Sequence, residues 1–147
     1  MADQIFPHFK KRMADGAIDL DGNDYWVLSK ILEKYKPRVI VAEANVRFEP
    51  YESMVMKYNP EWVWNGGDWY GASPYAFKKL VNSHNYTIVR ISEDDMFIIH
   101  NDYLHEDDKN REWIEIYPRS NVGLYGGHRG PGNEMILTVN MNTWMEI

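Results

Sequence analysis

The passage from Asp24 to Val41 constrains the fold most, because a helical pattern is followed at once by a strand pattern. Apolar side chains recur with the spacing of one helix face, at Val27, Leu28, Ile31, Leu32 and Tyr35. Pro37 ends that pattern, and a β-branched run follows at Val39, Ile40 and Val41. Such a run is typical of a strand buried on both faces of a parallel sheet. We therefore predict a helix over residues 24–35 and a strand over residues 38–43.

The segments around this pair extend the pattern. After a predicted turn at Asp15-Gly16, residues 17–20 form a short strand, which completes a βαβ unit. Ser73-Pro74 begins a second helix that ends near Asn85, with the serine as N-cap and the proline at the first helical position. Residues 86–91 and 96–100 are two strands whose short connection predicts an antiparallel hairpin. The fold class is therefore α/β.

The remaining segments are less regular. Residues 4–14 are predicted to form a short helix, and residues 46–70 an irregular, aromatic-rich segment. The sequences "EWIEIY" (112–117) and "EMILTVNM" (134–141) are predicted as two further strands. We expect one domain over 1–147, with an N-terminal region (1–16), a core (17–103) and a C-terminal extension (104–147).

Composition excludes several classes of function. The 147 residues carry a net charge of −6 and no cysteine, so disulfides, thiolate metal sites and cysteine nucleophiles are excluded. An acidic chain with one short basic cluster, Lys10-Lys11-Arg12, argues against nucleic-acid binding. The sequence has no apolar stretch of membrane-spanning length and no apolar core of a secretion signal near Met1. We expect a cytoplasmic protein that binds neither membranes nor nucleic acid.

An acidic turn, "IDLDGND" (18–24), follows the first predicted strand. Asp19 and Asp21 would lie at the end of that strand, and Glu43 and Asn45 at the end of the next. Neighbouring parallel strands would bring these oxygen-bearing side chains together, where they could bind Mg²⁺ or Ca²⁺. The predicted metal ligands are Asp19, Asp21 and Glu43.

A structural role for the same turn stays open beside the metal site. Asp21 or Asn23 could accept hydrogen bonds from the free N–H groups at the start of the helix. Asp24 would complement the positive end of the helix dipole, and Asp19 would bind backbone amides.

Four segments together resemble one protein family: "DLDGNDYWVL" (19–28), "KPRVIVAEAN" (36–45), "WYGASPYAFKKL" (69–80) and "GLYGGHRGPG" (123–132). They resemble the C-terminal half of FkbM-like class I methyltransferases, which depend on S-adenosylmethionine, and their uncharacterised relatives. The resemblance runs from about Ile18 to about Gly132. It implies a partial Rossmann-like sheet, in which residues 17–20 and 38–43 are the family's fourth and fifth strands and the hairpin is its final antiparallel pair.

The resemblance also bears on the cofactor. In that family, S-adenosylmethionine binds mostly to the first half of the fold, through a glycine-rich turn after strand one and an acidic residue after strand two. This chain has neither feature. The resemblance therefore implies a fragment or reduced relative, without the cofactor-binding strands and without methyl transfer of its own. By analogy with the family layout, Tyr70, Ser73 and His128 would lie near the site.

Two other classes of function remain open. "AIDLDGN" also resembles the motif of haloacid dehalogenase phosphatases, in which Asp19 would be the nucleophile and Asp21 the acid/base beside Mg²⁺. Alternatively, the aromatic loop 58–70 could make the chain a non-enzymatic binding or assembly module. A half-domain leaves apolar surface and a sheet edge to cover, so we expect a homodimer or higher oligomer.

Overall fold

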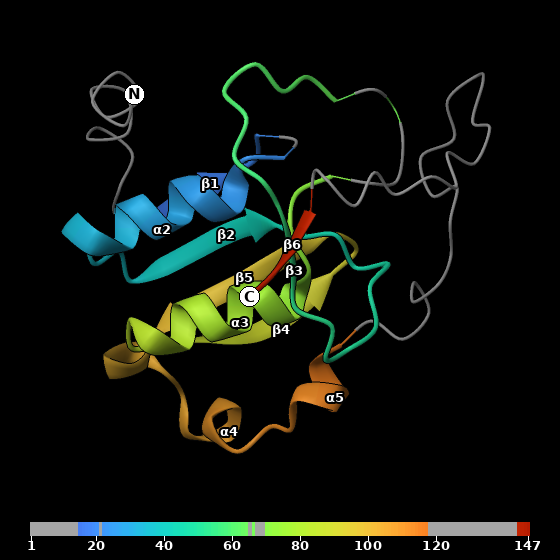
Figure 1. Ribbon diagram of the computed structural model, residues 1–147. Helices are drawn as coiled ribbons and strands as arrows, with labels where there is room; N and C mark the ends of the chain where they lie inside the picture. The colour runs from blue at the N-terminus through green and yellow to red at the C-terminus, as the bar shows by residue number, and fades with distance from the viewer. Residues whose placement is uncertain (1–14, 21, 65, 67–69, 118–143) are drawn as a thin grey trace.

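The computed structural model describes residues 15–20, 22–64, 66, 70–117 and 144–147 (Figure 1). The first elements are β1 (Asp15–Ile18), α2 (Asp24–Lys34), β2 (Val39–Glu43) and β3 (Met54–Met56). They are followed by α3 (Pro74–Ser83), β4 (Tyr86–Ser92), β5 (Asp95–His100) and the 3₁₀ helix η1 (Asn101–Tyr103). The short helices α4 (Glu106–Lys109) and α5 (Trp113–Ile116) come next, and β6 (Trp144–Glu146) is last. The protein is thus a mixed α/β fold.

A mixed sheet of four strands organises the molecule, in the order β1-β2-β5-β4. β1 and β2 are parallel, and β5 is antiparallel to both of its neighbours, β2 and β4. The predicted parallel pair and the predicted hairpin are therefore both confirmed. A second sheet pairs β3 with β6, which joins the irregular middle segment to the end of the chain.

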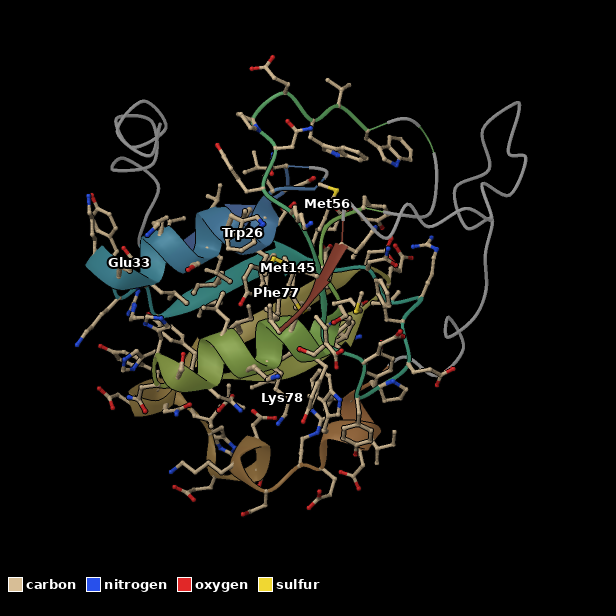
Figure 2. The ribbon with its side chains drawn as sticks, viewed as in Figure 1. Trp26, Glu33, Met56, Phe77, Lys78 and Met145 are labelled. Carbon is tan, nitrogen blue, oxygen red and sulfur yellow. The ribbon has the colours of Figure 1, made fainter. Side chains whose placement is uncertain are left out.

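Helices α2 and α3 lie on the same side of the four-stranded sheet (Figure 1). Each buries one stripe, including Leu28 and Ile31 of α2 and Phe77 and Val81 of α3. Phe77, labelled in Figure 2, meets Tyr25 of α2 at a ring-centroid distance of 5.5 Å. Burial of these side chains is the main source of stability for such a layer. None of the helices that the structure describes is long and apolar enough to cross a bilayer.

The two faces of the sheet are buried to different degrees. Ile40 and Ala42 of β2 are fully buried, whereas Val39 and Val41, which alternate with them, are only partly buried. The prediction that this strand is covered on both faces is therefore wrong for the described part of the chain. The β-branched run reflects strand propensity and one buried face.

The predicted boundaries differ from the observed ones at three places. β1 begins at Asp15, so Asp15 and Gly16 pair with β2 rather than form a turn. β3 interrupts the segment predicted to be irregular. The predicted strand "EWIEIY" is wrong, because its core forms α5. In α5 the side chains of Glu112 and Glu115 form a reciprocal capping box, and Trp113 and Ile116 are buried.

Three predicted features lie outside the described residues. They are the N-terminal helix 4–14, the strand 134–141 and the glycine-rich stretch 123–132. The α3 prediction is confirmed, including Ser73 as N-cap, whose Oγ accepts a hydrogen bond from the backbone N–H of Ala76 at 3.3 Å.

Candidate functional site

The carboxyl ends of β1 and β2 meet at one edge of the sheet. Ile18 lies opposite Ala42 in the parallel register, so Asp19 and Glu43 follow at neighbouring positions. Glu43 in turn lies opposite Asp95 of β5. The predicted parallel pairing of the two strands is thus confirmed, whereas the convergence of the Asp19 and Glu43 side chains and their joint function stay predictions. Asp19 is exposed and Glu43 is half-buried.

This end of the sheet, the acidic edge, carries Asp19, Glu43, Asp94 and Asp95. Burial raises the pKa of Asp95, and the negative charges of Asp19, Asp94 and Glu93 raise it further. The effect of Asp19 on Asp95 places the end of β1 within electrostatic range of the β4–β5 turn. An edge with this charge favours ligands that donate N–H or O–H groups, or carry positive charge.

A buried polar network lies beside the acidic edge. Asn45, which is fully buried, donates from Nδ2 to the backbone oxygen of Tyr70 at 3.2 Å and accepts from the backbone N–H of Arg47 at 3.2 Å. The Tyr70 hydroxyl donates to Asp94 Oδ2 at 2.9 Å and accepts from Arg47 Nη1 at 3.3 Å. Arg47 Nη1 also lies 3.8 Å from Asp94 Oδ2. The network joins the segment after β2, the segment before α3, and the β4–β5 turn.

The charges in the network explain how Tyr70 is held. Burial raises the pKa of the Tyr70 hydroxyl far above its ordinary value, and the negative charges of Asp94 and Glu43 raise it further. The hydroxyl is therefore a neutral donor at physiological pH. The neutral Tyr70 hydroxyl bridges Arg47 and Asp94, and this network holds the side chains next to the acidic edge in place.

Sequence reasoning named Asn45 and Tyr70 for this region but missed Arg47 and Asp94. Both contacts of Arg47 reach residues more than 20 positions away in the sequence. The available signal was weak: a charged side chain, Arg47, stands between Val46 and Phe48, both of which are buried. A buried cation requires a partner, so this pattern indicates an acceptor elsewhere in the fold.

One carboxylate of the acidic turn before α2, that of Asp24, has a structural role. Asp24 is fully buried and accepts hydrogen bonds from the backbone N–H groups of Leu20 and Gly22, both at 3.0 Å. Burial raises the pKa of Asp24, and its backbone hydrogen bonds offset part of that rise. Asp24 thus closes the turn as well as occupying the first helical turn.

Asn23 does not cap α2 through its side chain, so that part of the capping prediction is wrong. Its side chain instead forms a two-way bridge with the backbone of Asn59: Nδ2 donates to Asn59 O at 2.9 Å, and Oδ1 accepts from Asn59 N–H at 3.3 Å. The bridge fastens loop 57–64 to the start of α2.

Gly22 completes the same attachment. A Cβ atom at Gly22 would lie 2.5 Å from Trp62 Nε1 and 2.9 Å from the Met56 methyl group, and φ at this position is +156°. Glycine is therefore required for the close approach. Trp26, labelled with Met56 in Figure 2, donates from Nε1 to Met56 O at 2.8 Å.

The other predicted site residues divide into two groups. Ser73 is structural, since its Oγ caps α3 and also accepts from Met54 N–H at 3.0 Å. Asp21 and His128 lie outside the described residues. Within the described ranges no group of three or more His, Asp or Glu side chains could hold a metal ion. Because Asp21 belongs to both the predicted metal site and the predicted phosphatase pair, those two ideas stay predictions.

Loop 57–64 combines anchored and exposed apolar side chains. Trp62 packs on Gly22 and against the small cluster of Phe48, Met56 and Trp144. Val63 is 80% exposed, and Tyr58 and Trp64 are also exposed. The loop is therefore held next to the start of α2 and presents apolar side chains to solvent.

No family model matches this chain, and no curated protein or solved structure matches it significantly.

Proposed function

We propose that this chain is a methyltransferase-like α/β domain that binds a small polar ligand at the acidic edge and transfers no methyl group by itself. The main support for this proposal is that the parallel strands β1 and β2 end side by side, just before Asp19 and at Glu43. The rigid network of Asn45 and Tyr70 lies directly beside them. In open α/β sheets, ligands bind beyond the carboxyl ends of such strands.

The topology supports the methyltransferase-like part of the proposal. The resemblance implies two parallel strands followed by a final antiparallel pair, and the sheet has β1 and β2 parallel and β4 and β5 antiparallel. The sequence contains no glycine-rich turn and acidic strand end of the kind that the resemblance associates with S-adenosylmethionine. For this reason the proposal excludes autonomous methyl transfer.

The ligand class follows from the charge of the edge. Asp19, Glu43 and Asp95 are acceptors when ionised, and the negative charges of Asp19, Asp94 and Glu93 around Asp95 make this edge attractive to hydrogen-bond donors and cations. A ligand with several hydroxyl or amino donors satisfies such acceptors. Sugars, amino sugars and polyamines are the classes to test.

Two-dimensional NMR of the full chain tests the proposal. We expect amino sugars or polyamines to shift the amide signals of residues 19 and 43–47, and S-adenosylmethionine to shift none. The double variant Asp19→Asn, Glu43→Gln should abolish these shifts, whereas Asp107→Asn on the exposed helix α4 should preserve them. Tight binding of S-adenosylmethionine would contradict the absence of methyl transfer by the chain itself. No response to any of the sugars, amino sugars and polyamines would contradict ligand binding at the acidic edge.

The assembly-module alternative has one observation of its own, the exposed Val63, Tyr58 and Trp64 on an anchored loop. Replacing Val63 and Trp64 with serine would remove an apolar contact surface while leaving Trp62 in place. Loss of self-association in that variant, with unchanged NMR shifts by amino sugars, would favour this alternative.

A further inference from the structure

Three aromatic side chains from distant parts of the sequence form one group, the aromatic cluster of Tyr51, Tyr75 and Trp113. Tyr51 precedes β3, Tyr75 lies near the start of α3, and Trp113 is the first residue of α5. The ring centroids of Tyr51 and Tyr75 are 5.5 Å apart with an interplanar angle of 75°. Those of Tyr75 and Trp113 are 6.2 Å apart with an angle of 52°. Neighbouring rings in this cluster are thus steeply inclined to one another and form adjoining walls rather than a flat stack.

The turn Glu49-Pro50-Tyr51-Glu52 explains why one of these rings is exposed. Proline favours the second position of a β-turn because its φ is fixed. The backbone N–H of Glu52 donates to Glu49 O at 3.0 Å, and Glu52 Oε2 accepts from the backbone N–H of Glu49 at 3.1 Å. Tyr51 follows the proline in this closed turn and is 62% exposed.

The turn is fastened to α5 by two hydrogen bonds. Trp113 Nε1 donates to Pro50 O at 2.6 Å, and the Tyr117 hydroxyl donates to Phe48 O, also at 2.6 Å. The reciprocal capping box of α5 fixes the backbone at Trp113. A ligand that contacts the cluster therefore meets an ordered surface and loses little free energy in ordering it.

The chain places one of its own cations on this cluster. Lys78 of α3, labelled in Figure 2, has its Nζ atom 5.7 Å from the ring centroid of Tyr75 and 5.7 Å from that of Trp113. The face of an aromatic ring attracts a cation that lies within about 6 Å of its centroid. Two inclined rings of the cluster therefore share a single ammonium group.

Negative charge next to the cluster strengthens its attraction for cations. Burial raises the pKa of the Tyr117 hydroxyl, and the negative charges of Glu49 and Glu52 raise it further. The ring of Tyr117 meets that of Trp113 edge to face at a centroid distance of 5.5 Å. The two carboxylates on either side of Tyr51 thus act on the same group of rings, in the sense that favours a positively charged ligand.

We propose that the aromatic cluster binds a quaternary ammonium group, such as that of choline, in exchange for the Lys78 ammonium. The lysine ammonium is strongly hydrated and sits on a flexible stem, so it can return to solvent. A quaternary ammonium has no N–H group to offer to water, and aromatic walls are a common means of binding it. The same property separates this site from the acidic edge, where the proposed ligands donate N–H or O–H groups.

Two-dimensional NMR of the full chain, titrated with choline at constant ionic strength, tests the proposal. We expect saturable shifts of the amide signals of residues 51, 52, 75–78 and 113. The comparison ligand is the neutral isostere of choline, in which a tert-butyl group replaces the trimethylammonium group. It has nearly the same shape but no charge, and we expect it to shift none of these signals.

Tyr51→Leu removes the exposed wall of the cluster and keeps an apolar side chain. We expect it to weaken choline binding by about two- to fivefold, the loss of one cation–π contact at an exposed site. Tyr103→Leu is the matched control. Tyr103 is 61% exposed, close to the 62% of Tyr51, and its ring contacts His100 rather than the cluster. The control should bind choline as the wild type does.

Lys78→Ala tests the exchange and shifts the affinity in the opposite direction. It removes the competing ammonium, so choline should bind more tightly by about two- to fivefold. Lys79→Ala removes the same charge from the next residue of α3, whose ammonium donates to Ile147 O instead of lying over a ring. We expect Lys79→Ala to change the affinity less than Lys78→Ala does.

Four results would overturn the proposal. They are the absence of any response to choline, an equal response to the neutral isostere, unchanged binding in Tyr51→Leu, and no tighter binding in Lys78→Ala than in Lys79→Ala. Choline shifts confined to residues 19 and 43–47 would also contradict it, because they would assign the cation to the acidic edge. The two proposed sites involve different amide signals, so either can fail without the other.

Discussion

The turn between β1 and α2 and the turn between β4 and β5 both contain several carboxylates. In each turn one carboxylate is stabilised by hydrogen bonds, but the donors differ. In the first turn, Asp24 accepts hydrogen bonds from the backbone N–H groups of Leu20 and Gly22. In the second turn, Asp94 accepts a hydrogen bond from the Tyr70 hydroxyl and lies near the Arg47 guanidinium. The neighbouring Asp19 and Asp95 remain exposed in both cases. A cluster of like charge in a sequence can thus contain one structural carboxylate and others that remain available for a ligand.

The two turns also differ in their backbone. The first contains Gly22, with φ of +156° and an indole packed against its Cα. The second contains Glu93, with φ of +57°, which is a left-handed conformation that side chains other than glycine rarely adopt. The first turn is therefore fitted to its surroundings, whereas the second carries local strain.

The largest expected effect is from Asp24→Ala. It leaves two backbone N–H groups without their acceptor in a buried turn, which should lower the free energy of unfolding by about 2–4 kcal/mol. Urea denaturation measures this change. Asp19→Ala, at an exposed position in the same turn, is the control and should change stability little. Equal effects of the two variants would show that Asp24 has no special structural role.

Tyr70→Phe tests the second turn. It removes one hydroxyl from the buried network and leaves Arg47 and Asp94 without their bridge, which should cost about 1–2 kcal/mol of unfolding free energy. Tyr51→Phe removes a hydroxyl from a ring that is 62% exposed and should have no measurable effect. If both variants were as stable as the wild type, the β4–β5 turn would not depend on side-chain compensation.

Glu93→Gly should stabilise the protein slightly. Relief of the left-handed conformation outweighs the added freedom of the unfolded chain, with a net gain of about 0.5–1 kcal/mol. Thermal unfolding of this variant beside Glu146→Gly, a change in β6 where no positive φ occurs, gives the comparison. A loss of stability in Glu93→Gly would show that the side chain itself contributes to the turn.

The pH dependence of stability gives the subtlest test. Burial raises the pKa of Asp24 in the folded state, so the folded chain binds its proton more readily than the unfolded chain does. The contribution of Asp24 to stability should therefore increase as pH falls through its folded pKa toward its ordinary value of 3.8. The difference in unfolding free energy between the wild type and Asp24→Asn should follow this curve. A difference that stays constant with pH would contradict the raised pKa.

Local sequence patterns predicted α2, α3, β2 and the β4–β5 hairpin, because each has a periodicity, a cap or a short connection that decides its structure nearby. Among the predictions that failed, two show how contacts elsewhere in the fold decide the local structure. Asp15-Gly16 has the composition of a turn, yet it pairs with β2. "EWIEIY" has the composition of a strand, yet a capping box and burial of Trp113 and Ile116 make it helical.

The candidate site was predicted in part for the same reason. Asp19 and Glu43 could be placed together because parallel neighbours align their carboxyl ends. The burial of Asp24 and the bridging role of Tyr70 depend on contacts across the fold, which no local pattern contains. The two-way bridge from Asn23 to Asn59 spans 36 residues and is likewise invisible to local rules.

The pairing of β3 with β6 has a consequence for the order of folding. All strands of the larger sheet occur before Asn101, so that sheet can assemble while later residues are still being synthesised. The smaller sheet joins Met54 to Glu146, and the backbone N–H of Ile147 donates to Ser53 O. Contacts this distant in sequence form slowly. The strand Met54–Met56 therefore gains its partner only after Trp144–Glu146 has been synthesised, well after the larger sheet.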